Sequence, residues 1–212
     1  MKTTIHKAES RGQADHGWLK ANHSFSFASW HNPSRMNFGA LRVLNDDTVA
    51  AGAGFPTHPH ANMEIITIPL SGTLEHKDSM GNTAQIKTGE IQVMSAGTGV
   101  THSEYNASST EELKLFQIWL FPNKQNVTPR YDELKLNPKD RHNKFQQILS
   151  PTPEDAGVWI HQEAWLHMIS MDQHTEQEYN LKSQDNGVYI MVVEGAIEIN
   201  DTTLSYRDAI AI

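Results

Sequence analysis

The sequence predicts an all-β protein, built as a sandwich or barrel of short antiparallel strands. Its apolar runs are short, they are separated by turn residues, and they recur along most of the chain. Strands of this length with regular turn signals are typical of sandwiches and barrels. In the first half of the chain, the runs expected to form strands are residues 40–44, 64–70, 73–76, 90–94 and 113–121.

The turn residues that close these runs are rich in Asn, Asp, Ser and Gly, which favour tight turns. We expect the run 40–44 to end at Asn45-Asp46-Asp47 and the run 64–70 to end at Ser71-Gly72. Pro69 lies inside the second of these runs. Because a strand proline belongs at an edge, an end or a bulge, we expect an irregular strand there.

Residues 123–144 differ in composition from the rest of the chain. They are polar, with few large apolar residues, and Pro122, Pro129 and Pro138 lie in or beside them. We therefore expect a linker, with a short helix around residues 131–136. Strand patterns return at residues 158–161, 165–170, 189–193 and 196–200. The predicted domains are residues 1–122, the linker 123–144 and residues 145–212.

Composition excludes several classes of protein. The chain of 212 residues has 17 Lys and Arg against 25 Asp and Glu, a formal net charge of −8. This charge repels phosphate, so we expect no direct nucleic-acid binding. No stretch approaches the length of a membrane span, and residues 1–17 lack the apolar run of a signal peptide, which predicts a cytoplasmic protein. With no cysteine, any metal must be held by imidazole and carboxylate groups, which suit Fe, Mn, Co, Ni, Cu or Zn.

Two pairs of potential metal ligands stand out. His58 and His60 are two residues apart, and His102 and Glu104 repeat this spacing about forty residues later. In a strand, residues i and i+2 point to the same face, so each pair can converge on one ion. If the two strands face each other across a barrel, the four side chains meet at one point. Three imidazoles and one carboxylate suit a first-row divalent ion.

The fourth ligand is open to an alternative, because Glu64 shares the parity of His58 and His60. We favour Glu104, since its pairing with His102 mirrors the first pair. The remaining histidines are expected to be surface or packed residues, and His76, His161 and His167 belong to the packed group. A histidine beside a strand is more often packed or hydrogen-bonded than a ligand.

A wider set of motifs resembles the cupin superfamily and its pirin branch. The spacing Gly52-x5-His58-x-His60-x3-Glu64 resembles the first cupin motif, and Gly89-x5-Ser95-x-Gly97 followed by His102-x3-Asn106 resembles the second. Ser95 in place of proline and two extra residues before His102 are departures that resemble the pirin branch. Further segments resemble pirins at residues 16–19, 24–27, 41–46, 75–81, 94–99, 149–151, 160–163 and 193–195.

This resemblance implies an all-β bicupin, made of two antiparallel jelly-roll barrels, with one metal ion in the N-terminal barrel only. It implies His58, His60, His102 and Glu104 as the ligands and Fe(II) as the ion, with Zn, Mn, Co, Ni and Cu left open. By the family pattern the chain ends within a strand, so the second barrel is expected to be incomplete at its C-terminus.

Bacterial relatives of this type resemble quercetin 2,3-dioxygenases, which implies a flavonol and O2 as substrates. The metal would lower the pKa of the flavonol hydroxyl, and Glu104 would take the proton as the catalytic base. The anion would then react with O2, and the heterocycle would open with loss of carbon monoxide. Aromatic or apolar residues near the ligands, namely Phe38, Phe55, Met63 and Met94, are candidates for the pocket, with ordinary core packing as the alternative.

Two other functions stay open at this point. Pirins also resemble metal-containing regulators, which would act through a protein partner rather than by catalysis. A third reading is a structural metal ion in a small-molecule-binding cupin. Fold alone does not choose among them, because one scaffold hosts many functions.

Overall fold

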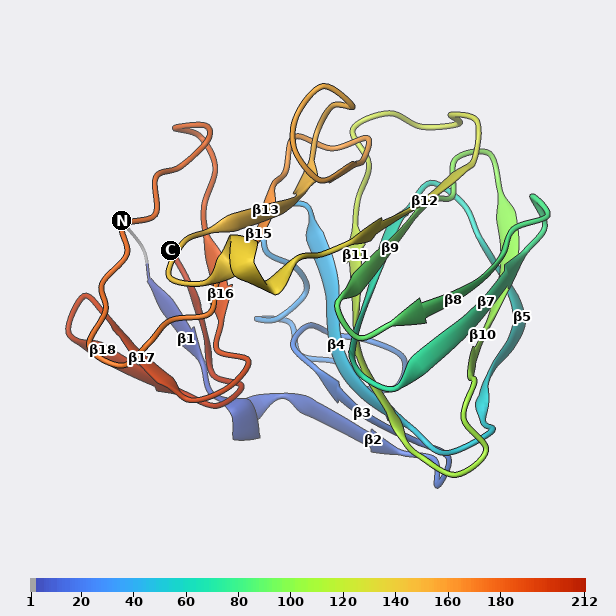
Figure 1. The fold of residues 1–212 in the computed structure, drawn as a ribbon, viewed down its shortest axis with the longest axis horizontal. Helices are drawn as coiled ribbons and strands as arrows, with labels where there is room; N and C mark the ends of the chain where they lie inside the picture. Colours follow the sequence, from blue (N-terminus) through green and yellow to red (C-terminus); the bar gives the residue numbers. More distant parts are fainter. Residues whose placement is uncertain (1–2) are drawn as a thin grey trace.

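The computed structural model describes residues 3–212, so the first two residues of the predicted N-terminal domain lie outside the description. The described chain consists of strands and two short 3₁₀ turns, η1 (Ala8–Ser10) and η2 (Pro138–Arg141). Figure 1 shows two β-rich lobes side by side, and the first and last strands, β1 (Thr4–His6) and β19 (Ala209–Ala211), both lie in the lobe formed by the C-terminal part. The all-β prediction is confirmed. Among the described residues, no helix is long and apolar enough to cross a membrane.

Two sheets form the first lobe. The larger has seven strands in the order β12-β9-β6-β11-β4-β3-β2, and the smaller has four in the order β5-β10-β7-β8. The strands of the larger sheet are β2 (Gly12–Asp15), β3 (Leu19–His23), β4 (Leu41–Val49), β6 (Glu64–Ser71), β9 (Glu90–Ser95), β11 (Leu113–Leu120) and β12 (Arg130–Lys135). Those of the smaller sheet are β5 (Gly54–His60), β7 (Thr73–Asp78), β8 (Thr83–Lys87) and β10 (Val100–Asn106).

Apolar side chains between these two sheets close the first barrel. Leu19, Val49 and Leu115 of the larger sheet pack with Leu74 and Ile86 of the smaller one, and all five are buried. Along β10, buried side chains alternate with more exposed ones. This period of two is what a strand with one face in the core requires. The barrel interior therefore receives every second side chain of β10.

The second lobe contains three small sheets. Their orders are β1-β19-β16, β14-β13-β15 and β17-β18. The strands are β1 (Thr4–His6), β13 (Gln146–Ser150), β14 (Val158–Trp159), β15 (Leu166–Met168), β16 (Tyr189–Met191), β17 (Ala196–Ile199), β18 (Thr202–Ser205) and β19 (Ala209–Ala211). A second core cluster joins the lobes, since Ile66 and Ile118 of the first lobe pack in one cluster with Ile148 and Ile160 of the second.

The chain ends meet in this second lobe. Strand β1 pairs antiparallel with β19, with Ile5 opposite Ile210. Beside this pair, the Asp208 carboxylate accepts hydrogen bonds from Lys7 Nζ at 2.8 Å and from the backbone N–H of Ala8 at 2.9 Å. The predicted domain boundaries at residues 122 and 145 stay a prediction. β1 belongs by sequence to the predicted N-terminal domain, but it pairs into a sheet of the second lobe.

Two local predictions are wrong. The residues Asn45-Asp46-Asp47 do not form a turn, because β4 runs through them to Val49. Asn45 and Asp47 are buried and point into the barrel, so their polarity belongs to an internal surface rather than to a loop. Residues 131–136 do not form a helix either, because β12 pairs there with the edge of β9. The expectation for Pro69 is confirmed, since the pairing of β6 with β11 shifts register opposite it.

A buried histidine near the N-terminus should make stability depend on pH. His6 is 7% exposed, and its Nδ1 lies 3.0 Å from the Tyr189 hydroxyl. Burial, with a smaller contribution from Arg35, lowers the pKa of His6 from 6.5 to about 4. Between these two pH values the imidazole of His6 is protonated in the unfolded chain and neutral in the folded chain. The free energy of unfolding is therefore highest above pH 6.5 and falls as the pH drops below it. We expect the free energy of unfolding to fall by about 1–2 kcal/mol more in wild type than in His6→Gln between pH 7.5 and 5.0.

Urea unfolding of the metal-free proteins at both pH values measures this difference. His142→Gln is the matched control, because the His142 side chain is 60% exposed. An equal loss of stability in wild type and His6→Gln would contradict the assignment to His6.

Candidate metal centre

The four predicted ligands lie on two neighbouring strands of the smaller sheet. β5 carries His58 and His60, β10 carries His102 and Glu104, and the two strands pair antiparallel with His102 opposite His58. The expectation that these strands face each other across the barrel is therefore wrong. His58, His60 and His102 come together because adjacent residues of neighbouring strands point to the same face of a sheet, whereas Glu104 does not join the group of His58 and His60.

A bulge in β5 sets the register at this point. His58 pairs with His102, but Phe55 pairs with Glu104, so β5 has one more residue than β10 between the two pairs. Pro56 lies within the extra length, and proline is tolerated at bulges because it has no N–H to donate. The three histidines lie on the regular side of this bulge, so it changes which residue of β5 lies opposite Glu104 and not the pairing of the histidines.

His58, His60 and His102 form a three-histidine metal site. One ligand atom from each lies within 4.8 Å of the others. The ring centroids are 4.9 Å apart for His58 and His60, 4.5 Å for His58 and His102, and 5.0 Å for His60 and His102. Two nitrogens on one ion are at most about 4.2 Å apart, twice the usual metal–nitrogen distance, so small adjustments bring the rings to a common ion.

The hydrogen bonding of the imidazoles fits a metal ion. His102 is 1% exposed, yet neither of its ring nitrogens has a hydrogen-bond partner within residues 3–212. A buried polar group without a partner is costly, and a metal ion would satisfy it. His58 Nδ1 lies 2.8 Å from the Pro56 carbonyl, which leaves its Nε2 available as a ligand.

Two of these imidazoles are strongly biased to their neutral form. Burial lowers the pKa of His60 to about 4 and that of His102 to about 3, and neighbouring imidazoles add to both shifts. Imidazole must be neutral to bind a metal ion. These two rings are already neutral near pH 7, so metal binding need not displace a proton from them.

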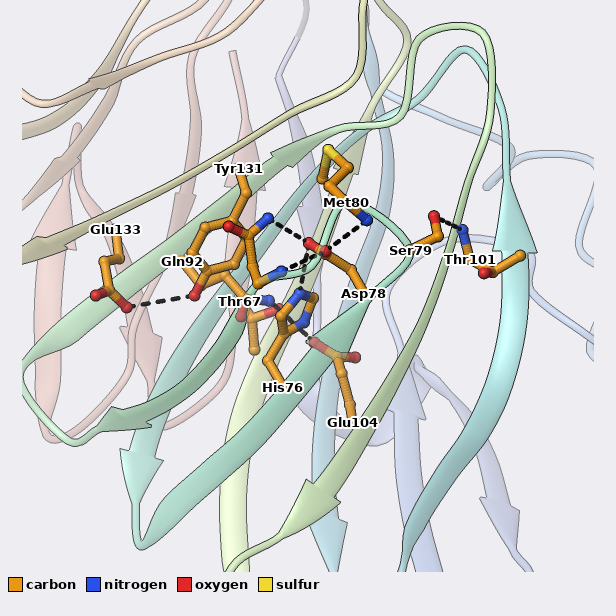
Figure 2. Close-up of polar contacts among 11 residues, drawn as sticks. Thr67, His76, Asp78, Ser79, Met80, Gln92, Thr101, Glu104, Tyr131 and Glu133 are labelled. Carbon is orange, nitrogen blue, oxygen red and sulfur yellow. Dashed lines mark hydrogen bonds and ion pairs between the residues drawn. The ribbon is translucent and has the colours of Figure 1, made fainter.

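Glu104 is buried beside the histidines and is held by polar neighbours. Its carboxylate oxygens lie 3.1 Å from Thr67 Oγ1, 3.2 Å from Gln92 Nε2 and 2.8 Å from Gln117 Nε2. Figure 2 shows Glu104 together with Thr67 and Gln92. Glu104 falls into a second group of potential ligands with His76 and His102, so His102 is common to both groups.

The sequence did not single out His76 as part of this site. It is fully buried, its Nε2 lies 3.1 Å from Asp78 Oδ2, and its ring stacks on Tyr131 at 4.9 Å between centroids. Figure 2 shows the contact between His76 and Asp78. In the structure β7 pairs with the ligand strand β10 and places His76 opposite Glu104. The one sequence signal for this was the spacing of two residues between His76 and Asp78, which repeats the spacing of the two ligand pairs.

Glu64 lies outside both ligand groups. It accepts a hydrogen bond from Ser95 Oγ at 2.6 Å and is 1% exposed. Burial raises the pKa of Glu64, and the Ser95 hydrogen bond partly offsets that rise. Glu64 therefore has a partner of its own away from the histidines.

A cavity of about 370 Å³ adjoins the ligands. His58 and Glu104 line it from the smaller sheet, and strands β3, β4 and β11 line it from the larger one. The volume lies within the range of small-molecule sites, about 300–1,000 Å³. The other lining residues are Leu19, Ala21, His23, Phe27, Asn45, Asp47, Phe55, Pro56, Thr57, Gln117 and Trp119.

Of the four residues suggested for the pocket, one lines the cavity. Phe55 lies there, whereas Met63 and Met94 pack in a small core cluster and Phe38 packs on the core between the lobes. Phe27 and Trp119 supply the remaining aromatic surface, and their rings meet edge to face at 5.4 Å. Trp119 also meets His60 edge to face at 4.9 Å, so it links the cavity to the metal site.

One buried carboxyl group in the cavity is unusual. Asp47 is 4% exposed, and its Oδ1 has no hydrogen-bond partner in the described chain. Burial raises the pKa of Asp47 to about 8, and the nearby carboxylates of Asp46 and Glu104 add to the rise.

The chain matches known proteins over nearly its whole length. The profile of the family named Pirin matches residues 4–120, and that of the quercetinase C-terminal cupin domain matches residues 147–212. A protein of Escherichia coli K12 named quercetin 2,3-dioxygenase is 47% identical over 208 residues, which cover 98% of this chain and 88% of that protein. A pirin-like protein of Caulobacter vibrioides is 41% identical over 202 residues, which cover 95% and 86%.

The fold recurs in a solved structure of a metal complex. The crystal structure of the bacterial pirin YhhW from Escherichia coli in complex with nickel(II) matches with a TM-score of 0.93 at 45% identity, covering 100% of this chain and 90% of that one. The predicted fold of two cupin domains is thereby confirmed. With these matches and a three-histidine metal site in its first barrel, the chain belongs to the pirin family.

Proposed function

We propose that the protein is a metal-dependent dioxygenase that cleaves a flavonol such as quercetin. The observation that carries the proposal is the 370 Å³ cavity, which has aromatic walls and reaches both His58 and Glu104. Relatives that match almost the full chain are named quercetin 2,3-dioxygenases, which supports the same activity here.

The proposed ligands are His58, His60, His102 and Glu104, and the proposed ion is Fe(II). Three imidazoles and a carboxylate form a donor set that first-row divalent ions prefer, and four protein ligands leave coordination positions open for a substrate. To join the three imidazoles, the Glu104 carboxylate has to turn from its present amide and hydroxyl partners. When bound, the ion supplies the Lewis acidity that lowers the pKa of a flavonol hydroxyl.

The protein side chains bind and orient the flavonol. Phe27, Phe55 and Trp119 offer flat apolar surfaces to a planar aromatic molecule, and their rigid rings cost little conformational entropy. Glu104 is the proposed base that takes the hydroxyl proton. Gln92 and Gln117 donate hydrogen bonds to its carboxylate in the present arrangement, before it turns toward the ion.

An aerobic assay with quercetin tests the proposal. Protein loaded with Fe(II) should consume quercetin and O2 and release carbon monoxide, followed by flavonol absorbance, an oxygen electrode and gas analysis. Loading with Ni(II), Mn(II) or Zn(II) instead compares the ions. His102→Ala treated with the same metal controls for autoxidation of quercetin in solution. Wild-type protein that holds its metal but turns over no faster than this control would disprove the activity and favour a regulatory role.

Replacing Glu104 separates its role from that of the histidines. Glu104→Gln keeps the shape but removes the negative charge and most of the basicity, so we expect a loss of at least about 100-fold in kcat. The measurement is steady-state turnover of quercetin together with metal content. Glu75→Gln is the matched control, because Glu75 pairs with Lys77 at the surface of the same sheet. Wild-type turnover in Glu104→Gln would remove Glu104 from the mechanism.

A further inference from the structure

The wall of the cavity opposite the metal ligands has a polar part on β4. β4 runs through Asn45-Asp46-Asp47, and alternate side chains of a strand point to opposite faces. Asn45 and Asp47 therefore both line the cavity. The Asp46 carboxylate points away from it and forms ion pairs with Arg11 Nη1 at 3.2 Å and with Arg207 Nε at 2.8 Å.

Only part of this polar wall is satisfied by the protein. Asn45 Oδ1 lies 2.9 Å from His23 Nδ1, so these two residues are partners of each other. Asp47 has an oxygen without any partner among residues 3–212, although the residue is 96% buried (4% exposed). A buried polar group without a hydrogen bond lowers the stability of the folded protein. A ligand that donates the missing hydrogen bond would explain why this carboxyl group is present.

The position of Asp47 says which part of a ligand would meet it. Asp47 belongs to the larger sheet, whereas His58 and Glu104 reach the cavity from the smaller sheet. A planar molecule with one hydroxyl at the metal ligands would therefore present a different edge to Asp47. Leu19, Phe27 and Phe55 line the same cavity, and their apolar surfaces suit its rings.

We propose that Asp47 is a substrate-binding residue that accepts a hydrogen bond from an outer-ring hydroxyl of the flavonol; this rests on the function proposed above. Asp47 thereby sets specificity for polyhydroxylated flavonols. A site built to hydrogen-bond a hydroxyl rejects the analogue that lacks it, because the buried acceptor is then left without a partner.

The test compares quercetin with 3-hydroxyflavone, which lacks hydroxyls on both outer rings. For Asp47→Leu we expect KM for quercetin to rise about 10- to 100-fold with little change in kcat, and kcat/KM for 3-hydroxyflavone not to fall. Asp47→Asn keeps a hydrogen-bonding oxygen and should retain most of the preference for quercetin. Asp46→Asn is the matched control, because it changes the adjacent carboxylate, which points away from the cavity.

Equilibrium binding under anaerobic conditions keeps this test separate from the activity. Both flavonols are titrated into metal-loaded protein, and bound flavonol is followed by absorbance. If wild type binds quercetin more tightly than 3-hydroxyflavone and Asp47→Leu does not, the role of Asp47 is supported even where quercetin is not turned over. The proposal is overturned if Asp47→Leu weakens the binding of both compounds equally, if it weakens the binding of neither, or if wild type does not discriminate. Thermal melts show whether each variant is folded.

Discussion

His102→Ala should abolish metal binding while leaving the barrel folded. His102 is shared by both groups of potential ligands, and it is the most buried of the three imidazoles in the metal site. Its two ring nitrogens lack partners among the described residues, so no hydrogen bond is lost with the side chain. We expect metal affinity to fall by well over about 100-fold, because even residues that only support a ligand cost 10- to 100-fold.

Isothermal titration with Ni(II) and metal analysis after dialysis measure the effect. His142→Ala is the matched control, since it removes an exposed imidazole in the second lobe and should keep one ion per chain. A His102→Ala protein that still binds one ion with wild-type affinity would exclude the three-histidine site.

Gly54→Ala should disturb the metal site although Gly54 is no ligand. Gly54 begins β5 and pairs with Tyr105, and a Cβ added there would lie 2.3 Å from the Glu104 carbonyl oxygen and 2.5 Å from Tyr105 Cα. These are backbone atoms, so the two ligand strands must move apart. We expect a loss of about 1–3 kcal/mol in the free energy of unfolding and a drop of at least about 10-fold in metal affinity.

Urea unfolding and metal titration together test this effect. Gly81→Ala is the matched control, because it places a methyl group in open space at a left-handed backbone position. It should lower stability by about 1–2 kcal/mol through backbone strain alone and leave metal affinity unchanged. Equal metal affinity in Gly54→Ala and wild type would show that β5 and β10 tolerate separation without loss of the site.

The histidine cluster could be predicted from the sequence because it depends on a local rule. Side chains two residues apart share a face of a strand, and this holds for His58 with His60 whatever the rest of the chain does. Which strands are neighbours is set by long-range pairing, and that information is not in the local pattern. The two ligand pairs were therefore expected on opposite walls, whereas β5 and β10 are hydrogen-bonded to each other.

The polar interior of the barrel explains the other differences. Asn45-Asp46-Asp47 has the composition of a turn, and only the three-dimensional structure reveals a cavity that gives buried polar side chains a place inside a strand. His76 was expected to be a packed histidine, and it is packed, on Tyr131. His76 lies opposite Glu104 because β7 pairs with β10. The strand at residues 45–47 and the position of His76 beside Glu104 both depend on contacts between distant parts of the chain, which the local sequence pattern does not contain.

The pairing of β1 with β19 has a consequence for synthesis in the cell. Residues 4–6 leave the ribosome about 200 residues ahead of their partners at residues 209–211. At 5–20 residues per second this delay is roughly 10–40 s, during which the first barrel can form and β1 remains an unpaired edge. The strand is only three residues long and two of its residues are polar, which limits its tendency to pair with other nascent chains.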